Sequence, residues 1–280
     1  YFLASSPHVL LSSEKAHNHI LVAVNELEGK SSQAAFDELL DDESTQLFLD
    51  SGIFSLTNQH ARKHGVPMDE ALALAPDEID GFQELWDLYC SLVVKYSDRL
   101  WGVIELDQGG AANKRKTRAR IEQETGIVPI PVYHPFNDGW DYFDEIASQY
   151  DRLCFGNVVQ ATQTQRIRLV TTMFERQRKD HPDTWIHLLG YSPNQWLNAL
   201  PYYGSCDSST WLAGIRWPMG HKSHAHLQRN TDLTFLTGMR YPLGDGEMHK
   251  IAYTFGGAQS GHFVEETWHA SADARREVGL

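Results

Sequence analysis

Acidic side chains end several of the short apolar runs in this chain. Asp50 follows LFL, Glu105 and Asp107 close VIELD, and Asp207 follows YGSC. Two carboxyl groups beside one reacting carbon can divide the work, because one acts as nucleophile or base while the other acts as acid. Like charges at close range also push pKa values apart, which suits a pair for different roles. If the fold gathers these acids, they predict a site for acid–base or covalent catalysis.

Other residues at comparable positions indicate a ligand pocket. His134 ends PVYH, and Gly156 in CFGN and Gly190 in LLGY lack side chains where a planar ligand would need room. The HKSHAH run over 221–226 offers imidazoles to a metal, but a histidine cluster in an irregular segment is a weak motif. We therefore expect a pocket without a metal.

Each of these residues also has a purely structural interpretation. An Asp after an apolar run is often the N-cap of the next helix, which would account for Asp50. Asp207, before Ser-Ser-Thr, can be a turn or cap residue in the same way. His134 can be a hydrogen-bonded residue at a strand end, and Phe54 and Trp211 can belong to the core. Residue types alone leave both interpretations open.

Short apolar runs alternate with helical patterns along most of the chain. Runs typical of strands cover 1–5, 46–50, 100–107, 128–134, 152–159, 184–191 and 203–207. Apolar residues three and four apart predict helices over 14–28, 31–41, 78–97, 112–124, 138–149 and 160–180. Such alternation implies parallel strands with right-handed crossovers. It favours an α/β fold of the (β/α)8 TIM-barrel type over an open doubly wound sheet.

A barrel would position the candidate residues. In barrels of this kind the active site forms at the carboxyl ends of the strands, so Asp50, Asp107, His134 and Asp207 are expected at one mouth. The two-residue period of a strand also predicts that Glu105 and Asp107 share a face.

The chain is expected to form one domain over residues 1–280. A barrel takes about 250 residues. No linker or repeat divides the chain. Beyond the expected strands and helices, we expect an irregular insertion near 213–247, a last strand near 248–255 and a helix from 263. No run approaches the roughly 18 apolar residues of a membrane span, and the first residues lack a basic leader. Three cysteines without a CxxC pair fit a reducing compartment, so a cytoplasmic protein is expected.

The balance of charge bears on nucleic-acid binding. A formal net charge of -13 argues against nucleic-acid binding, because phosphate contacts need a basic surface. The charge is uneven, however, and the segments 114–120 (KRKTRAR) and 221–229 (HKSHAHLQR) could form a local basic track. The candidate phosphate contacts in these segments are Lys114, Arg115, Lys116, Arg118, Lys222 and Arg229.

The common signatures GxGxxG, GxxxxGK[ST], HExxH and GxSxG are absent. With LFLDSGIFSL and YGSCDSSTWLAG, however, the chain resembles the tRNA-guanine transglycosylase superfamily. It is most similar to the compact phage and bacterial branch that installs 7-deazaguanine bases in DNA. DSGxF corresponds to 50–54, and VIELD, PVYH, CFGN and HLLGYS follow in the order of the family. DSSTW at 207–211 resembles the motif that carries the nucleophile, and the resemblance covers about residues 46–217.

The resemblance implies an exchange of bases at C1′ with retained configuration. Retention requires two displacements and a covalent sugar–enzyme intermediate. The implied nucleophile is Asp207, with Asp50 as general acid and then general base, and Asp107 as acceptor for the guanine N1–H and 2-amino groups. The other implied substrate-binding residues are Ser51, Phe54 (which would stack on the base), His134, Gly156, Gly190 and Trp211.

Two departures from the family bear on the substrate. The tRNA enzymes usually carry a CxC-type zinc site, which three scattered cysteines cannot form, so DNA is favoured over tRNA. Ile53 stands where those enzymes have a second glycine. The expected partners are DNA (alternatively tRNA), a free 7-deazaguanine base and helper proteins, without a membrane. No cofactor is expected, because one glycosidic bond replaces another, and the base must be flipped or single-stranded.

Three alternatives remain open at this stage. The chain could be a queuine-type tRNA-guanine transglycosylase. It could be a metal-dependent TIM-barrel hydrolase that uses Asp50, Asp107, His134 and the histidines of 221–226. It could also be a non-catalytic nucleic-acid-binding or base-binding subunit.

Overall fold

The computed structural model describes residues 2–12, 18–158, 161–191 and 204–209. Several expectations therefore lie outside the described residues. They are the insertion at 213–247, the strand near 248–255, the helix from 263, and the side chains of Trp211, Lys222 and Arg229.

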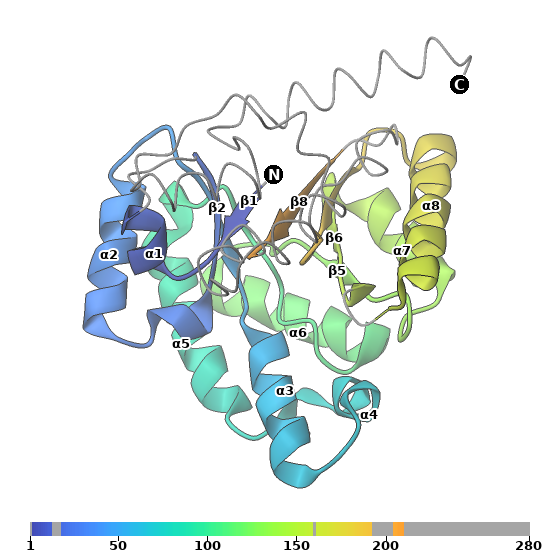
Figure 1. Cartoon of the computed structure of the whole chain (residues 1–280), viewed down its shortest axis with the longest axis horizontal. Helices are drawn as coiled ribbons and strands as arrows, with labels where there is room; N and C mark the ends of the chain where they lie inside the picture. The colour runs from blue at the N-terminus through green and yellow to red at the C-terminus, as the bar shows by residue number, and fades with distance from the viewer. Residues whose placement is uncertain (1, 13–17, 159–160, 192–203, 210–280) are drawn as a thin grey trace, which may run out of the picture.

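Eight parallel strands form one sheet in the described part of the chain (Figure 1). In chain order they are β1 (Phe2–Ala4), β2 (His19–Ala23), β3 (Gln46–Asp50), β4 (Gly102–Val103), β5 (Val132–Tyr133), β6 (Arg152–Phe155), β7 (Trp185–Leu188) and β8 (Gly204–Ser208). Their order across the sheet is β4-β3-β2-β1-β8-β7-β6-β5. Every ladder is parallel, as the alternation of strands and helices predicts.

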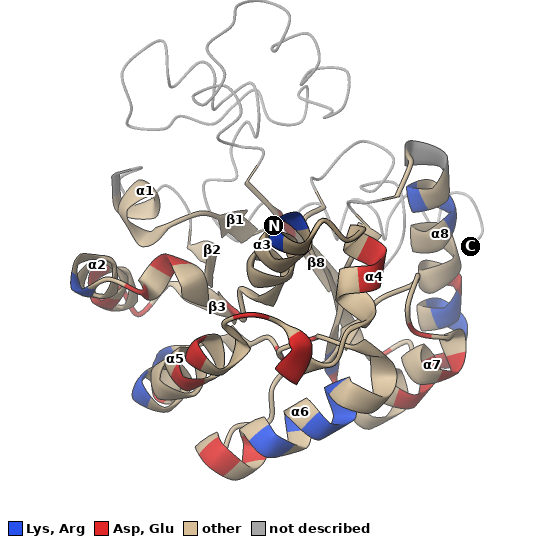
Figure 2. Ribbon diagram, turned by 90° about the horizontal axis from the view of Figure 1, so that it is seen from below, with Lys and Arg blue, Asp and Glu red and all other residues tan. Residues whose placement is uncertain are grey.

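The helices lie between the strands along the chain. They are α1 (Pro7–Ser12), α2 (Lys30–Leu40), α3 (Ile53–His64), α4 (Met68–Ala73), α5 (Phe82–Tyr96), α6 (Gly110–Thr125), α7 (Trp140–Gln149) and α8 (Gln163–Asp180). Three short 3-10 turns complete them: η1 (Val24–Leu27), η2 (Pro76–Glu78) and η3 (Ser97–Arg99). Figure 2 shows α2, α5, α6, α7 and α8 around the outside of the curled sheet.

The two edge strands of the sheet, β4 and β5, approach each other. A single parallel bridge joins Ile104 to Ile130. The Ile130 N–H donates to the Val103 carbonyl at 2.7 Å, and the Glu105 N–H donates to the Ile130 carbonyl at 3.1 Å. The described chain is thus an α/β protein whose parallel sheet curls into at least half a barrel.

Two apolar cores lie on the two faces of this sheet. A small inner cluster includes Phe2, Phe48, Ile104 and Cys154, with Trp185 packed against it. A larger cluster joins the outer face to the helices through residues such as Leu49, Phe36 and Trp86. Because strand side chains alternate between faces, Asp50 lies on the same face as Phe48 and is directed to the inner side.

The expected helix over 14–28 is wrong. Residues His19–Ala23 form strand β2, which pairs with β1 on one side and β3 on the other. Both faces of β2 are covered, because Ile20 and Val22 pack in the larger core and Leu21 packs in the inner cluster. HILVA therefore lacks the alternation that marks a half-buried strand. The expected strand over 100–107 is also shorter, because β4 ends at Val103.

Within the described residues, none of the helices combines the length and the apolar character required to cross a bilayer.

Candidate active site

Asp50 ends strand β3, and a tight turn follows it. Gly52 has a left-handed backbone, with φ of 76°, and its N–H donates to Asp50 Oδ2 at 3.2 Å. A Cβ at position 52 would lie 2.6 Å from Asn25 Oδ1, so both backbone and space require glycine. Gly52 itself is the N-cap of α3. The interpretation of Asp50 as helix cap is therefore wrong.

The next residues divide between core and surface. Ser51 is buried, and its hydroxyl accepts the Ile53 N–H at 3.4 Å. Ile53 is buried in the larger core at the first residue of α3, which explains why an apolar side chain is accepted there. Phe54 remains 43% exposed. An exposed aromatic ring one turn from Asp50 is free to stack on a ligand.

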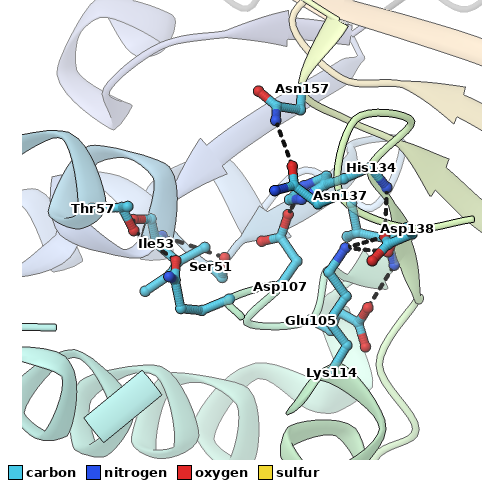
Figure 3. A network of polar contacts seen from close by, with 12 residues as sticks. Ser51, Ile53, Thr57, Glu105, Asp107, Lys114, His134, Asn137, Asp138 and Asn157 are labelled. Atoms are coloured by element: carbon cyan, nitrogen blue, oxygen red, sulfur yellow. Dashed lines mark hydrogen bonds and ion pairs between the residues drawn. The ribbon is translucent and has the colours of Figure 1, made fainter. Parts of the chain in front are cut away.

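Asp107 and His134 form a close pair (Figure 3). Asp107 Oδ2 lies 2.6 Å from His134 Nε2, and both side chains are largely buried. The His134 backbone N–H donates to Asp138 Oδ2 at 2.8 Å, which holds this strand end in place. A Cβ at Gly156 would come within 3.1 Å of the His134 ring, so this glycine makes room for the imidazole.

The pKa of Asp107 lies below its ordinary value. Burial raises it, but the charge of His134, its hydrogen bond and the charge of Lys114 lower it by more. Asp107 is therefore an ionised acceptor, with one oxygen already held by His134.

Asp207 lies on β8 and is buried. Its Oδ1 accepts the Gly190 N–H at 2.8 Å and lies 3.1 Å from His187 Nε2. Gly190 has φ of 66°, a conformation that suits glycine and directs its N–H at the carboxylate. The role expected for Gly190 was to leave space for a base; its described contact is a hydrogen bond to Asp207.

Asp107 and Asp207 both affect the titration of Asp50. The pKa of Asp50 is raised from 3.8 to about 7, first by burial, then by the negative charge of Asp107 and, more weakly, of Asp207. Two backbone hydrogen bonds only partly oppose this rise. The pKa of Cys154 on β6 is also raised by burial and then by the same three acids. The fold thus gathers the ends of β3, β8 and the segment after β4 around one site.

A second polar network lies behind Asp107, between β4, β5 and α6. Glu105 accepts the Val132 N–H at 2.7 Å and pairs with Arg118 at 3.2 Å. Lys114 pairs with Asp138 at 2.6 Å, with both side chains fully buried. Glu105 and Asp107 therefore have different hydrogen-bond and ion-pair partners. The expected common strand face is wrong, because β4 ends at Val103, before either residue.

This network corrects two of the expected phosphate contacts. Lys114 and Arg118 are buried and paired with carboxylates, so neither can reach a phosphate. Arg115 is exposed but pairs with Glu145, whereas Lys116 is exposed and forms no ion pair within the described part of the chain. Figure 2 shows helix α6, which carries these basic residues, on the outside of the curled sheet.

Sequence reasoning missed three polar residues near these acids. His187 lies inside the strand WIHL and is followed by Leu188. It is therefore not at a strand end, which was the feature used to select candidate residues. Asp138 lies just beyond PVYH and holds both His134 and Lys114. Asn157 has φ of 62° and contacts Asn137 at 3.3 Å. Its position directly after Gly156 in CFGN was the available signal.

One group of possible metal ligands occurs in the described residues, away from the three aspartates. His60 and His64 lie one turn apart on α3, and their ligand atoms and those of Asp80 are within 4.8 Å of one another. The Asp80 N–H already donates to His60 Nδ1 at 3.1 Å, and Lys63 lies 2.6 Å from Asp80 Oδ2. Hydrogen bonds from Lys63 and His64 lower the pKa of Asp80 to about 2. These hydrogen bonds and ion pairs therefore connect α3 to the segment before α5 and account for the three side chains without a metal.

Comparison of the chain with family models, with curated proteins and with solved structures finds no match in any of the three. The contacts of the three aspartates are therefore the findings that bear on function.

Proposed function

We propose that the chain is a base-exchange transglycosylase that replaces guanine in DNA with a 7-deazaguanine derivative. The observation that carries the proposal is the pKa of Asp50, raised to about 7 by burial and by Asp107 and Asp207. A carboxyl group that titrates near neutral pH can donate a proton in one step and accept one in the next. Base exchange needs such a group beside a nucleophile.

Asp207 is the proposed nucleophile. Its carboxylate attacks C1′ of the nucleotide while the bond from C1′ to guanine breaks, and Asp50 gives its proton to the departing base. The incoming 7-deazaguanine then loses a proton to Asp50 and displaces Asp207 from C1′. Two displacements retain the configuration, as in retaining glycosidases. The supporting observation is that Asp207 is close enough for its negative charge to contribute to the raised pKa of Asp50.

Asp107 is proposed to select the base. An ionised carboxylate can accept hydrogen bonds from the guanine N1–H and 2-amino groups, which adenine does not offer. The pair with His134 supports this role, because it keeps Asp107 ionised and holds its orientation. Phe54, exposed after the turn, is the proposed stacking surface.

We also propose that the eight strands close into a complete (β/α)8 barrel in one domain. The bridge between Ile104 and Ile130 and its two hydrogen bonds support closure between β4 and β5. Closure would place all strand ends at one mouth, where barrel enzymes carry their active sites.

DNA is preferred to tRNA because a cysteine-based zinc site has no support in the chain. Cys90, Cys154 and Cys206 are the three cysteines of the chain, and they lie on three different elements, α5, β6 and β8. A free 7-deazaguanine is the proposed second substrate.

Trapping of the covalent intermediate tests the function. Wild-type protein is incubated with guanine-containing single-stranded DNA, duplex DNA or tRNA, and adducts are resolved on a denaturing gel. We expect an adduct with DNA that free guanine releases. The adduct should be absent from Asp207→Asn and formed slowly by Asp50→Asn. Asp151→Asn, a change of an exposed aspartate, is the matched control.

Each other outcome has a defined meaning. An adduct with tRNA alone would contradict DNA as the substrate and support the queuine-type alternative. Failure of the wild type to form an adduct with any of the three nucleic acids would contradict transglycosylation. Adduct formation by Asp207→Asn would remove Asp207 from the role of nucleophile.

A further inference from the structure

His187 lies on β7, on the inner side of the sheet. Its side chain is fully buried. Aromatic rings surround it: Phe48 at a centroid distance of 4.9 Å, Phe2 at 5.4 Å and Trp185, stacked, at 5.8 Å. A histidine in such a setting could be simple core packing. Its two nitrogens, however, both have polar partners on the adjacent strand β8.

These partners determine where the proton of the ring lies. His187 Nδ1 is 2.6 Å from Ser205 Oγ, and Nε2 is 3.1 Å from Asp207 Oδ1. Burial lowers the pKa of His187, although Asp207 opposes this, so the ring is neutral and has one N–H. Asp207 Oδ1 already accepts the Gly190 N–H, so it acts as an acceptor towards His187 as well. Nε2 therefore carries the proton and donates to Asp207, while Nδ1 accepts from the Ser205 hydroxyl.

The two oxygens of Asp207 differ as a consequence. Oδ1 accepts from both His187 Nε2 and the Gly190 N–H. No hydrogen bond to Oδ2 occurs among the described residues. One oxygen is thus held by two donors, and within the described part of the chain no donor holds the other.

We propose that His187 is a positioning residue that, together with Ser205 and Gly190, holds Asp207 Oδ1 and presents Oδ2 to C1′ of the sugar. The inference rests on the proposed function, in which Asp207 is the nucleophile. An Oδ2 lone pair forms the bond to C1′, the glycosidic bond breaks, and its electron pair leaves with guanine, which takes the proton of Asp50. Oδ1 becomes the carbonyl oxygen of the sugar ester and keeps both hydrogen bonds.

Nitrogen NMR of the whole protein labelled with ¹⁵N-histidine tests the position of the proton without any substrate. The signals of His187 are assigned by their loss in His187→Gln. We expect a neutral ring protonated at Nε2 near neutral pH. Ser205→Ala should shift the Nδ1 resonance, whereas Ser148→Ala, a change of an exposed serine, should leave it unchanged. A ring protonated at Nδ1, or at both nitrogens, would overturn the inference.

The rate of adduct formation tests the role in positioning. Loss of one hydrogen bond to a charged group predicts a rate about 10- to 100-fold lower in His187→Leu, with unchanged affinity for the nucleic acid. His187→Gln, which retains an N–H donor, should recover part of the rate. Weaker nucleic-acid binding at an unchanged rate would overturn the inference. If His187→Leu does not fold, Ser205→Ala provides the same comparison.

The two proposals fail in different ways. If the wild type forms no adduct but His187 is protonated at Nε2, the proposed function and the positioning role of His187 are both contradicted. The hydrogen bonds of His187 are still confirmed in that case. A wild-type protein that forms the adduct with His187 protonated at Nδ1 loses only the positioning role.

Discussion

Asp50 owes its properties to the residues around it. A solvated aspartate titrates near 3.8, whereas burial and two neighbouring acids raise the pKa of Asp50 to about 7. The folded protein therefore binds this proton more tightly than the unfolded chain does. The associated stability is fully present below about pH 4 and is lost as the pH rises through 7.

The first prediction follows from this linkage. Asp50→Asn removes the cost of a buried charge, so it should raise the free energy of unfolding by about 1–3 kcal/mol at pH 8. The gain should vanish at about pH 3, where Asp50 is largely protonated in both states. Urea unfolding at the two pH values measures it, with Asp151→Asn as control. An equal effect at both pH values would contradict a raised pKa.

Gly52 allows a second prediction at the residue scale. Gly52→Ala meets both a left-handed backbone and Asn25 Oδ1 at 2.6 Å, so it should cost about 2–4 kcal/mol in unfolding free energy. Gly65 at the other end of α3 has φ of 67° with nothing within 4 Å of an added Cβ. Gly65→Ala should therefore cost only about 1 kcal/mol. Equal losses in the two variants would show that the contact with Asn25 is unimportant.

At the scale of elements, helix α6 shows how a basic segment becomes part of the interior. Its buried positions are Lys114, Thr117, Arg118 and Ile121, which follow the spacing of one helical face. The two charges on that face pair with Asp138 and Glu105. Burial raises the pKa of Glu105 to about 7, although Arg118 and Lys114 oppose it. The segment KRKTRAR thus joins α6 to β4 and β5.

A prediction at this scale compares two lysines of α6. Lys114→Ala leaves Asp138 buried without its partner and should cost about 3–5 kcal/mol in unfolding free energy. Lys116→Ala, on the exposed face, should change it by no more than about 0.5 kcal/mol. Chemical denaturation of both variants measures the difference. A loss below 1 kcal/mol for Lys114→Ala would contradict its role as a structural residue.

At the scale of the whole molecule, closure of the sheet decides whether the acids share one mouth. In the described residues one backbone bridge, between Ile104 and Ile130, joins the two edges, and its two hydrogen bonds have ordinary lengths of 2.7 and 3.1 Å. Glu105 lies directly beside this bridge, so the buried ion pairs of α6 support the same junction.

Hydrogen exchange tests this closure. The amides of Glu105 and Ile130 should exchange only by global unfolding, as the amides of the ladder between β2 and β3 do. Site-resolved exchange by NMR measures both sets under the same conditions. Exchange of Glu105 and Ile130 that is faster by orders of magnitude would indicate that the edge between β4 and β5 opens by itself.

The sequence alone determined the α/β class, most of the element positions and the candidates Asp50, Asp107, His134 and Asp207. Strand ends and helix spacing are local patterns, so these could be predicted. Strand β2 could not, because a strand that is buried on both faces loses its alternation.

Only the tertiary structure decided which charged side chains form buried ion pairs and which remain accessible to a ligand. Lys114 and Arg118 have the side chains of a phosphate-binding track, but packing of α6 on the sheet buries them against acids distant in sequence. Packing also set the raised pKa of Asp50 and the contacts of His187, since each depends on neighbours from other strands. Residue type gives the ordinary chemistry of a side chain; burial and long-range partners determine its protonation and orientation.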